Sequence, residues 1–99
     1  MYVMVTSNYP MNKYPEAVEV FKKGIESALP EYVEHLHTFA RADVDKGMKS
    51  YAIYRVADEK LSEGYIAIAR RMEPCWSIEG YTYSVEIVTD AVAYVQQRG

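Results

Sequence analysis

Two kinds of apolar pattern alternate along the chain. β-branched and aromatic residues, which favour strands, cluster in segments 2–7 (YVMVTS), 32–41 (YVEHLHTFAR), 49–56 (KSYAIYRV) and 81–88 (YTYSVEIV). Apolar residues three or four positions apart, which predict amphipathic helices, occur between Glu16 and Pro30 and between Asp58 and Pro74. A further short helix is predicted at residues 90–98 (DAVAYVQQR).

Each predicted helix has an apolar face and signals for its ends. Pro15 suits the first turn of the first helix, and Pro30 is expected to stop it. Asp58 is expected to cap the second helix and Thr89 the last one, while Pro74 is expected to end the second. The apolar faces consist of Ala17, Val18, Phe21, Ile25, Ala28 and Leu29 in the first helix and of Leu61, Tyr65, Ile68 and Met72 in the second. We expect the second of these faces to pack on the sheet.

The order of elements is β-α-β-β-α-β followed by a short helix. Residues 42–48 (ADVDKGM) join the second and third strands as a hairpin, because Asp and Gly tolerate unusual backbone dihedrals. This order predicts an α+β, ferredoxin-like fold, with an antiparallel four-stranded sheet and two helices on one of its faces. Residues 1–99 are expected to form a single domain.

The face of the sheet away from the helices is expected to be partly apolar. A solvated face reads as polar, but on the first strand Val3 and Val5 alternate with Tyr2 and Met4, and the chain holds ten tyrosines. Tyrosine suits a covered, partly wet surface because its ring is apolar and its hydroxyl is polar. We therefore expect a homodimer formed sheet against sheet. The alternative is an exposed face on which tyrosine is simply a good strand residue.

Charge and composition restrict the partners. The formal net charge is −3 and the sequence pI about 5.3, so a nucleic-acid partner is not expected. No run of 18 apolar residues predicts a membrane span, and the first residues, MYVMVTSNY, do not read as a signal peptide. The single cysteine, Cys75, can form no internal disulfide and no cysteine-based zinc site, which fits a cytoplasmic location.

Four segments carry a resemblance to known proteins: MVTSNYP, EAVEVFKKG, YAIYRVAD and WSIEGYTYSVEIVTD. Together with the element order, they resemble a family of small prokaryotic domains of unknown function in the dimeric α/β-barrel superfamily. The resemblance covers most of the chain. It implies a ferredoxin-like fold and a homodimer, and it brings no agreed activity.

The two histidines of EHLHTF are a candidate site. His35 and His37 are two apart, so in a regular strand they are expected to share one face. Zinc, copper or iron would require at least a third ligand. Glu34 is expected to point the other way, and no carboxylate on a neighbouring strand is expected to face the same side. Glu86 is the nearest candidate, and it lies on the mixed side of the fourth strand. No metal and no other cofactor are therefore expected.

A second candidate set is Asn8, Trp76 and a histidine. Haem-degrading and antibiotic-biosynthesis monooxygenases of the dimeric α/β-barrel type use an Asn at the end of the first strand with a Trp and a His nearby. Here, however, both histidines are on the second strand. The alternative is that Trp76 anchors a loop by packing and Asn8 shapes a turn.

Two further classes find little support. RNA-recognition motifs share this element order, but KSYAIYRV matches their third strand only at Lys49, Tyr51 and Ala52. Cys75 follows Pro74 at a helix end, where the helix dipole disfavours a thiolate nucleophile. The pair at residues 70–71, Arg-Arg, is expected to be a favourable charge at the end of the second helix.

The sequence therefore predicts a homodimeric protein that binds a small molecule between its sheet and its helices. The residues expected around this pocket are Asn8, His35, His37, Tyr51 and Trp76. No catalytic residue is assigned, and whether the protein is an enzyme stays open. The alternatives are a monooxygenase without cofactor or with haem, and an interaction module without a ligand. The sequence does not identify the ligand.

Overall fold

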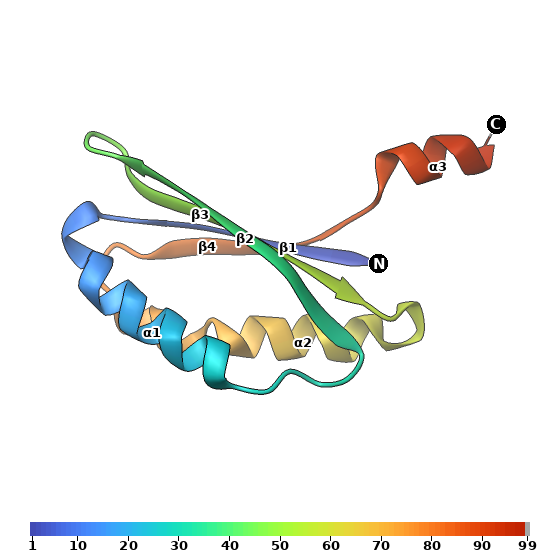
Figure 1. The fold of residues 1–99 in the computed structure, drawn as a ribbon, viewed down its shortest axis with the longest axis horizontal. Helices are drawn as coiled ribbons and strands as arrows, with labels where there is room; N and C mark the ends of the chain where they lie inside the picture. Colours follow the sequence, from blue (N-terminus) through green and yellow to red (C-terminus); the bar gives the residue numbers. More distant parts are fainter. Residues whose placement is uncertain (99) are drawn as a thin grey trace.

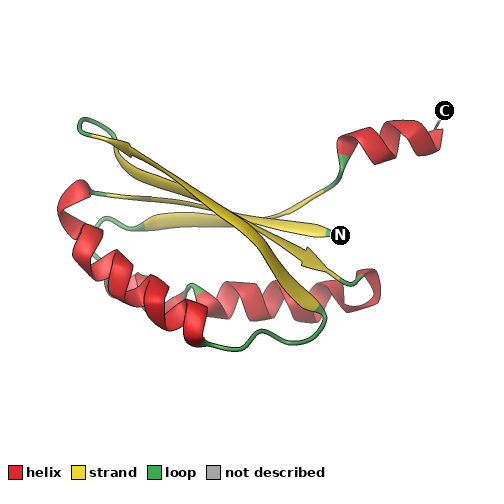
Figure 2. Ribbon diagram, viewed as in Figure 1, coloured by secondary structure: helices red, strands yellow, loops and turns green. Residues whose placement is uncertain are grey.

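A computed structural model describes residues 1–98, with the backbone alone at residue 98. The strands are β1 (Tyr2–Tyr9), β2 (Val33–Asp43), β3 (Gly47–Val56) and β4 (Thr82–Val88). The helices are α1 (Tyr14–Glu26), α2 (Leu61–Arg71) and α3 (Ala91–Arg98), with the 3₁₀ turns η1 (Met11–Lys13), η2 (Asp58–Lys60) and η3 (Glu73–Ser77). The strands form one antiparallel sheet in the order β2-β3-β1-β4. Helices α1 and α2 cover one face of this sheet, and α3 stands away from the body beyond the end of β4 (Figures 1 and 2).

The helix-covered face of the sheet holds the core. The alternation of residues left open which face this would be, because both faces of the first strand carry apolar residues. Val3 and Val5 of β1 are buried under the helices, while Tyr2 and Met4 point to the open face. Ile68 of α2 is fully buried in the central cluster. The other residues of the predicted α2 stripe, Leu61, Tyr65 and Met72, pack against the same cluster. The predicted orientation of α2 is therefore confirmed.

Gly64 allows α2 to approach the sheet closely. A Cβ at this position would lie 2.3 Å from Val56 Cγ1 and 3.3 Å from Val33 Cγ2, both in the core. Only a residue without a side chain fits this crossing of helix and strands.

Three predicted helix ends differ from the structure. Helix α1 ends at Glu26, before the predicted stop at Pro30, because Ser27 is already extended, at φ −76° and ψ 126°. Asp58 does not cap α2: its Oδ1 lies 2.7 Å from the Met1 amino group, and α2 begins only at Leu61. The last helix is capped by Asp90 rather than Thr89, since Asp90 Oδ1 accepts a hydrogen bond from the Ala93 N–H.

A β-bulge in β2 changes the direction of its side chains. His35 is paired with Tyr54 and His37 with Ile53, so Leu36 has no partner on β3. Paired residues of an antiparallel sheet point to the same side, and the neighbours Tyr54 and Ile53 point to opposite sides. His35 therefore faces the helices and His37 faces the open side. The prediction that the two histidines share one face is wrong because the extra residue of the bulge reverses the alternation.

The fold is α+β, and its arrangement is consistent with the ferredoxin-like fold predicted from the element order. In the hairpin between β2 and β3, Asp43 Oδ1 accepts hydrogen bonds from the N–H groups of Asp45 and Lys46, and Gly47 has a φ of 82°. Gly47 thus adopts the unusual dihedral predicted for this turn, whereas no non-glycine residue among residues 1–98 has a positive φ. The turn is also shorter than predicted, because β2 continues to Asp43 and β3 begins at Gly47. Within residues 1–98, no helix is both long and apolar enough to cross a membrane.

Candidate functional site: a cavity between the sheet and the helices

A cavity of about 80 Å³ lies between the middle of the sheet and the helical layer. Its origin is the small size of the side chains that face the helices there. Ser7 of β1 and Ser50 and Ala52 of β3 occupy central positions of the sheet, and Ala17 and Gly24 lie on the α1 side. These small residues leave space that larger side chains would fill in a closed core. The lining is completed by Val5, Val20, Phe21, His35, Thr38, Tyr54, Arg71, Met72, Cys75 and Tyr81.

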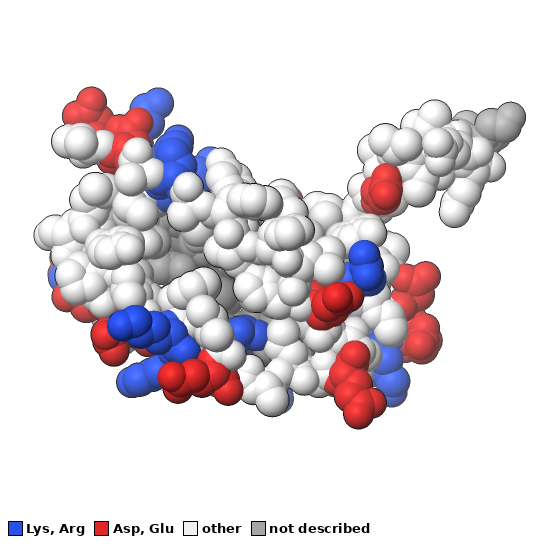
Figure 3. Space-filling model, in the orientation of Figure 1, with Lys and Arg blue, Asp and Glu red and all other residues white. Residues whose placement is uncertain are grey.

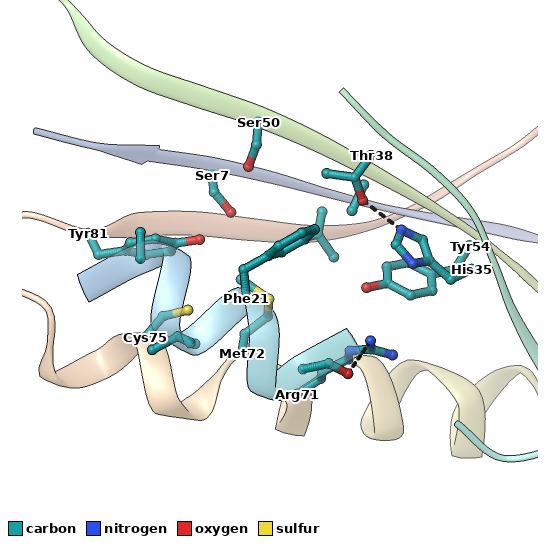
Figure 4. A pocket seen from close by; sticks show the side chains of 15 residues that line it. Ser7, Phe21, His35, Thr38, Ser50, Tyr54, Arg71, Met72, Cys75 and Tyr81 are labelled. Carbon is teal, nitrogen blue, oxygen red and sulfur yellow. Dashed lines mark hydrogen bonds between the residues drawn. The ribbon is translucent and has the colours of Figure 1, made fainter. Parts of the chain in front are cut away.

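One end of the cavity is formed by His35, Thr38, Tyr54 and Arg71 (Figure 4). His35 Nε2 lies 2.6 Å from Thr38 Oγ1, and the His35 ring stacks on the Tyr54 ring with centroids 4.8 Å apart. In a regular strand, residues three apart would point to opposite sides. The bulge at Leu36 is therefore what brings His35 and Thr38 together in the cavity.

Arg71 reaches into the cavity from the last turn of α2. Its Nη2 donates a hydrogen bond to the Gly24 carbonyl oxygen of α1. A Cβ at Gly24 would lie 3.6 Å from Arg71 Nε, an ordinary van der Waals contact, so the position packs closely against the guanidinium without requiring glycine. Arg71 Nη1, in contrast, is buried and has no hydrogen-bond partner. An unsatisfied buried donor costs about 1–3 kcal/mol, and more when it is charged.

The opposite end is formed by Ser7, Cys75 and Tyr81 (Figure 4). Burial raises the pKa of Tyr81, an effect that a hydrogen bond with Ser7 opposes. The Tyr81 ring is also stacked on Tyr9, at 5.2 Å between centroids. Burial raises the pKa of the Cys75 thiol, so this cysteine stays protonated near pH 7. This end is therefore a neutral, hydroxyl-rich wall.

The structure does not gather the five predicted pocket residues. His35 lines the cavity, whereas His37 is stacked on Phe39 on the open face of the sheet. Tyr51 is also on the open face, beneath Lys49. The other two lie elsewhere: Asn8 borders a shallow depression next to the hairpin turn, and Trp76, 70% exposed on η3, donates a hydrogen bond to the Tyr83 hydroxyl.

Arg71 is the functional residue that sequence reasoning misplaced. It was expected to be a solvated charge at the end of α2, a description that fits its exposed neighbour Arg70. The alternation of β1 and β3 held a signal for the cavity itself, since Ser7, Ser50 and Ala52 fall on the same side as the buried Val5. No comparable signal pointed to Arg71.

Metal ligation is not favoured by the placement of the histidines. His35 and His37 face opposite sides of the sheet, so they cannot bind one ion together. In the part of the chain that the structure describes, no three or more His, Cys, Asp or Glu side chains come together in a way that could hold a metal ion.

The burial of His35 has a consequence for stability. Burial lowers the pKa of His35 below its ordinary value of 6.5, and the positive charge of Arg71 adds to this effect. As the pH falls below 6.5, the unfolded chain takes up a proton at this histidine while the folded chain does not. The free energy of unfolding should therefore fall over that interval.

Urea unfolding on both sides of pH 6.5 measures this dependence. His35→Gln should show a smaller loss of stability on acidification than the wild-type protein. If the free energy of unfolding depended on pH equally in both proteins, His35 would not be the source of the loss of stability.

Comparison with protein-family models and with curated protein sequences gives no relative for this chain. No protein-family model matches it, and no curated protein is significantly similar in sequence.

Proposed function

We propose that this protein binds a small molecule in the cavity between its sheet and its helices. The cavity itself carries the proposal: it occupies the place where a two-layer fold normally closes its core. Its walls combine apolar side chains with a few convergent polar groups, as ligand sites do. These polar groups include Ser7, His35 and Arg71.

The size of the cavity restricts the ligand. On the same measure of volume, one water molecule needs roughly 10–15 Å³, and the cavity holds about 80 Å³. The ligand is therefore a molecule of roughly half a dozen non-hydrogen atoms, unless α1 moves. Helix α1 has little anchorage, since Ile25 is 58% exposed and Phe21, although it lines the cavity, is 48% exposed.

A cavity-filling variant tests this function. Ala52→Leu places a larger side chain in the middle of the cavity, while Ala42→Leu makes the same change at an exposed position of β2. In native mass spectrometry of protein taken from its own host, a bound small molecule should accompany wild type and Ala42→Leu and be absent from Ala52→Leu. Wild-type protein without any bound molecule, together with an Ala52→Leu variant that is more stable, would instead favour an interaction module without a ligand.

We also propose that the open face of the sheet is the interface of a homodimer of the dimeric α/β-barrel type. Apolar side chains occupy its middle, and they are Met4, Phe39, Tyr51 and Ile53. Charged residues lie toward its ends, where Arg55 pairs with Glu34 at 3.1 Å, and on the edge strand β4, where Glu86 lies beside Met4. An apolar centre with a polar rim is typical of a protein–protein interface.

Helix α3 supports a partner of the same kind. It has eight residues and stands off the body of the molecule (Figure 1). A helix this short is marginal in water unless it packs on something, since isolated helices need roughly 12–15 residues. Val92 and Val95 are 67% and 65% exposed, residues 91–97 include no charged residue, and the described part of α3 is mostly white in Figure 3. We propose that this apolar surface of α3 packs against a second copy of the chain.

The other predicted classes receive less support. The monooxygenase hypothesis required Asn8, Trp76 and a histidine in one site, and these residues line no common cavity. Whether the bound molecule is also chemically changed is a separate question, and no catalytic residue is proposed. A cytoplasmic location remains our expectation from the lone, unpaired Cys75.

A further inference from the structure

The cavity carries a positive charge without a counter-charge. Of the side chains that line it, Arg71 is always ionised, and none is an Asp or Glu. The ion pairs among the described residues do not include Arg71. Its Nη1 is buried without a hydrogen-bond partner, so one donor of the guanidinium remains unsatisfied and could bind an acceptor on a ligand.

The groups around Arg71 fit a small anion. Tyr54 and His35 face the guanidinium across this end of the cavity (Figure 4). Burial raises the pKa of Tyr54, so its hydroxyl stays protonated and can donate. A carboxylate matches a guanidinium in shape and can accept from a neighbouring hydroxyl as well.

The other walls of the cavity determine the size and polarity of the part of the ligand beyond its charged group. Val5, Ala52 and Phe21 offer apolar surface next to the charged end. A single guanidinium matches a single negative charge, and the volume of about 80 Å³ limits the body to a short chain. A phosphate, with more charge and no apolar part, fits these walls less well.

We propose that the cavity binds a small monocarboxylate, with its carboxylate on Arg71 and Tyr54 and its short apolar body against Val5, Ala52 and Phe21. The proposal rests on the small-molecule function above and specifies the class of ligand. The Arg71–Gly24 hydrogen bond between α2 and α1 holds the guanidinium in place for this contact.

Two isosteric probes separate charge from shape. Isobutyrate and isobutyramide have nearly the same size, but only isobutyrate is an anion at pH 7. In NMR titrations of the wild-type protein in chloride-free buffer, isobutyrate should bind about 10- to 100-fold more tightly than isobutyramide, because the amide has no negative charge and only one acceptor oxygen for the guanidinium. Shifts at the Gly24 and Ala52 amides would locate the binding in the cavity.

Matched variants test the role of Arg71. Arg71→Met should remove the preference for isobutyrate, whereas Arg70→Met, the same change on the exposed neighbour, should preserve it. Arg71→Lys keeps the charge but not the planar pair of donors, and it should retain part of the preference. If Arg71→Met does not fold, the titrations of the wild-type protein with isobutyrate and isobutyramide still test the proposal.

The outcomes distinguish this inference from the function on which it rests. Equal binding of both probes in the cavity would overturn the carboxylate but preserve a small-molecule site. If neither probe bound and the Gly24 and Ala52 amides did not shift, the result would count against both the carboxylate proposal and the small-molecule function. Chloride or inorganic phosphate binding as tightly as isobutyrate would overturn the proposal, because Arg71 would then hold an adventitious ion only.

Discussion

Replacing Ile68 with alanine is expected to lower the free energy of unfolding by about 2–5 kcal/mol. Ile68 lies on α2 with 0% of its surface exposed, in the cluster that also holds Val3, Val56 and Tyr54. Truncation removes apolar area from the core and leaves a hole that the surrounding strands cannot close, because the sheet holds them in register. This residue therefore reports directly on the contact between α2 and the sheet.

Ile66→Ala is the matched control, since Ile66 lies two positions away on the same helix and is half exposed. Its expected cost is within about 1 kcal/mol. Urea unfolding of both proteins should be measured at the same protein concentration, because the stability of a dimer increases with protein concentration. A loss below about 0.5 kcal/mol for Ile68→Ala would mean that α2 is turned differently.

The regular parts of this fold could be predicted because local pattern and global packing agree in them. The stripe from Leu61 to Met72 has one face that can be buried, and the structure buries it. The alternation of Val3 and Val5 with Tyr2 and Met4 predicts two opposite faces for β1, but both are apolar, so only the structure shows that Val3 and Val5 face the helices.

The bulge could not be predicted from the alternation that it interrupts. EHLHTF reads as a regular strand, and no glycine or proline marks the extra residue at Leu36. Its effect on function is large, since it sends His35 into the cavity and His37 to the opposite face. Helix α1 also ends earlier than predicted: the apolar spacing continues through Leu29, but the backbone is already extended at Ser27.

The cavity depends on long-range arrangement, which local pattern does not contain. The small residues of its walls come from three elements, β1, β3 and α1, and only the fold brings them together. Arg71 occupies a helix end where solvation is the ordinary outcome for arginine. It turns inward, where the Gly24 carbonyl oxygen of α1 accepts a hydrogen bond from its guanidinium.

A charge placed at the centre of the open face is expected to split the protein into monomers. Ile53 lies in the middle of this face, paired with Met4 on β1 and His37 on β2. If two copies pack sheet against sheet, Ile53→Asp buries an unpaired carboxylate in each copy, which is strongly unfavourable. At micromolar concentration, the light-scattering mass should fall from near twice 11.4 kDa to near 11.4 kDa.

The control for this variant is Ile25→Asp, which adds the same charge at an exposed position of α1, away from the sheet face. It should leave the mass near twice 11.4 kDa. Changing both Val92 and Val95 to Asp tests whether α3 contributes to the dimer. If α3 packs on the second copy, the variant should dissociate at a higher protein concentration than the wild-type protein. A wild-type protein that is monomeric at micromolar concentration would contradict the sheet-to-sheet dimer. Circular dichroism shows whether each variant is folded, so that loss of the dimer is not confused with loss of the fold.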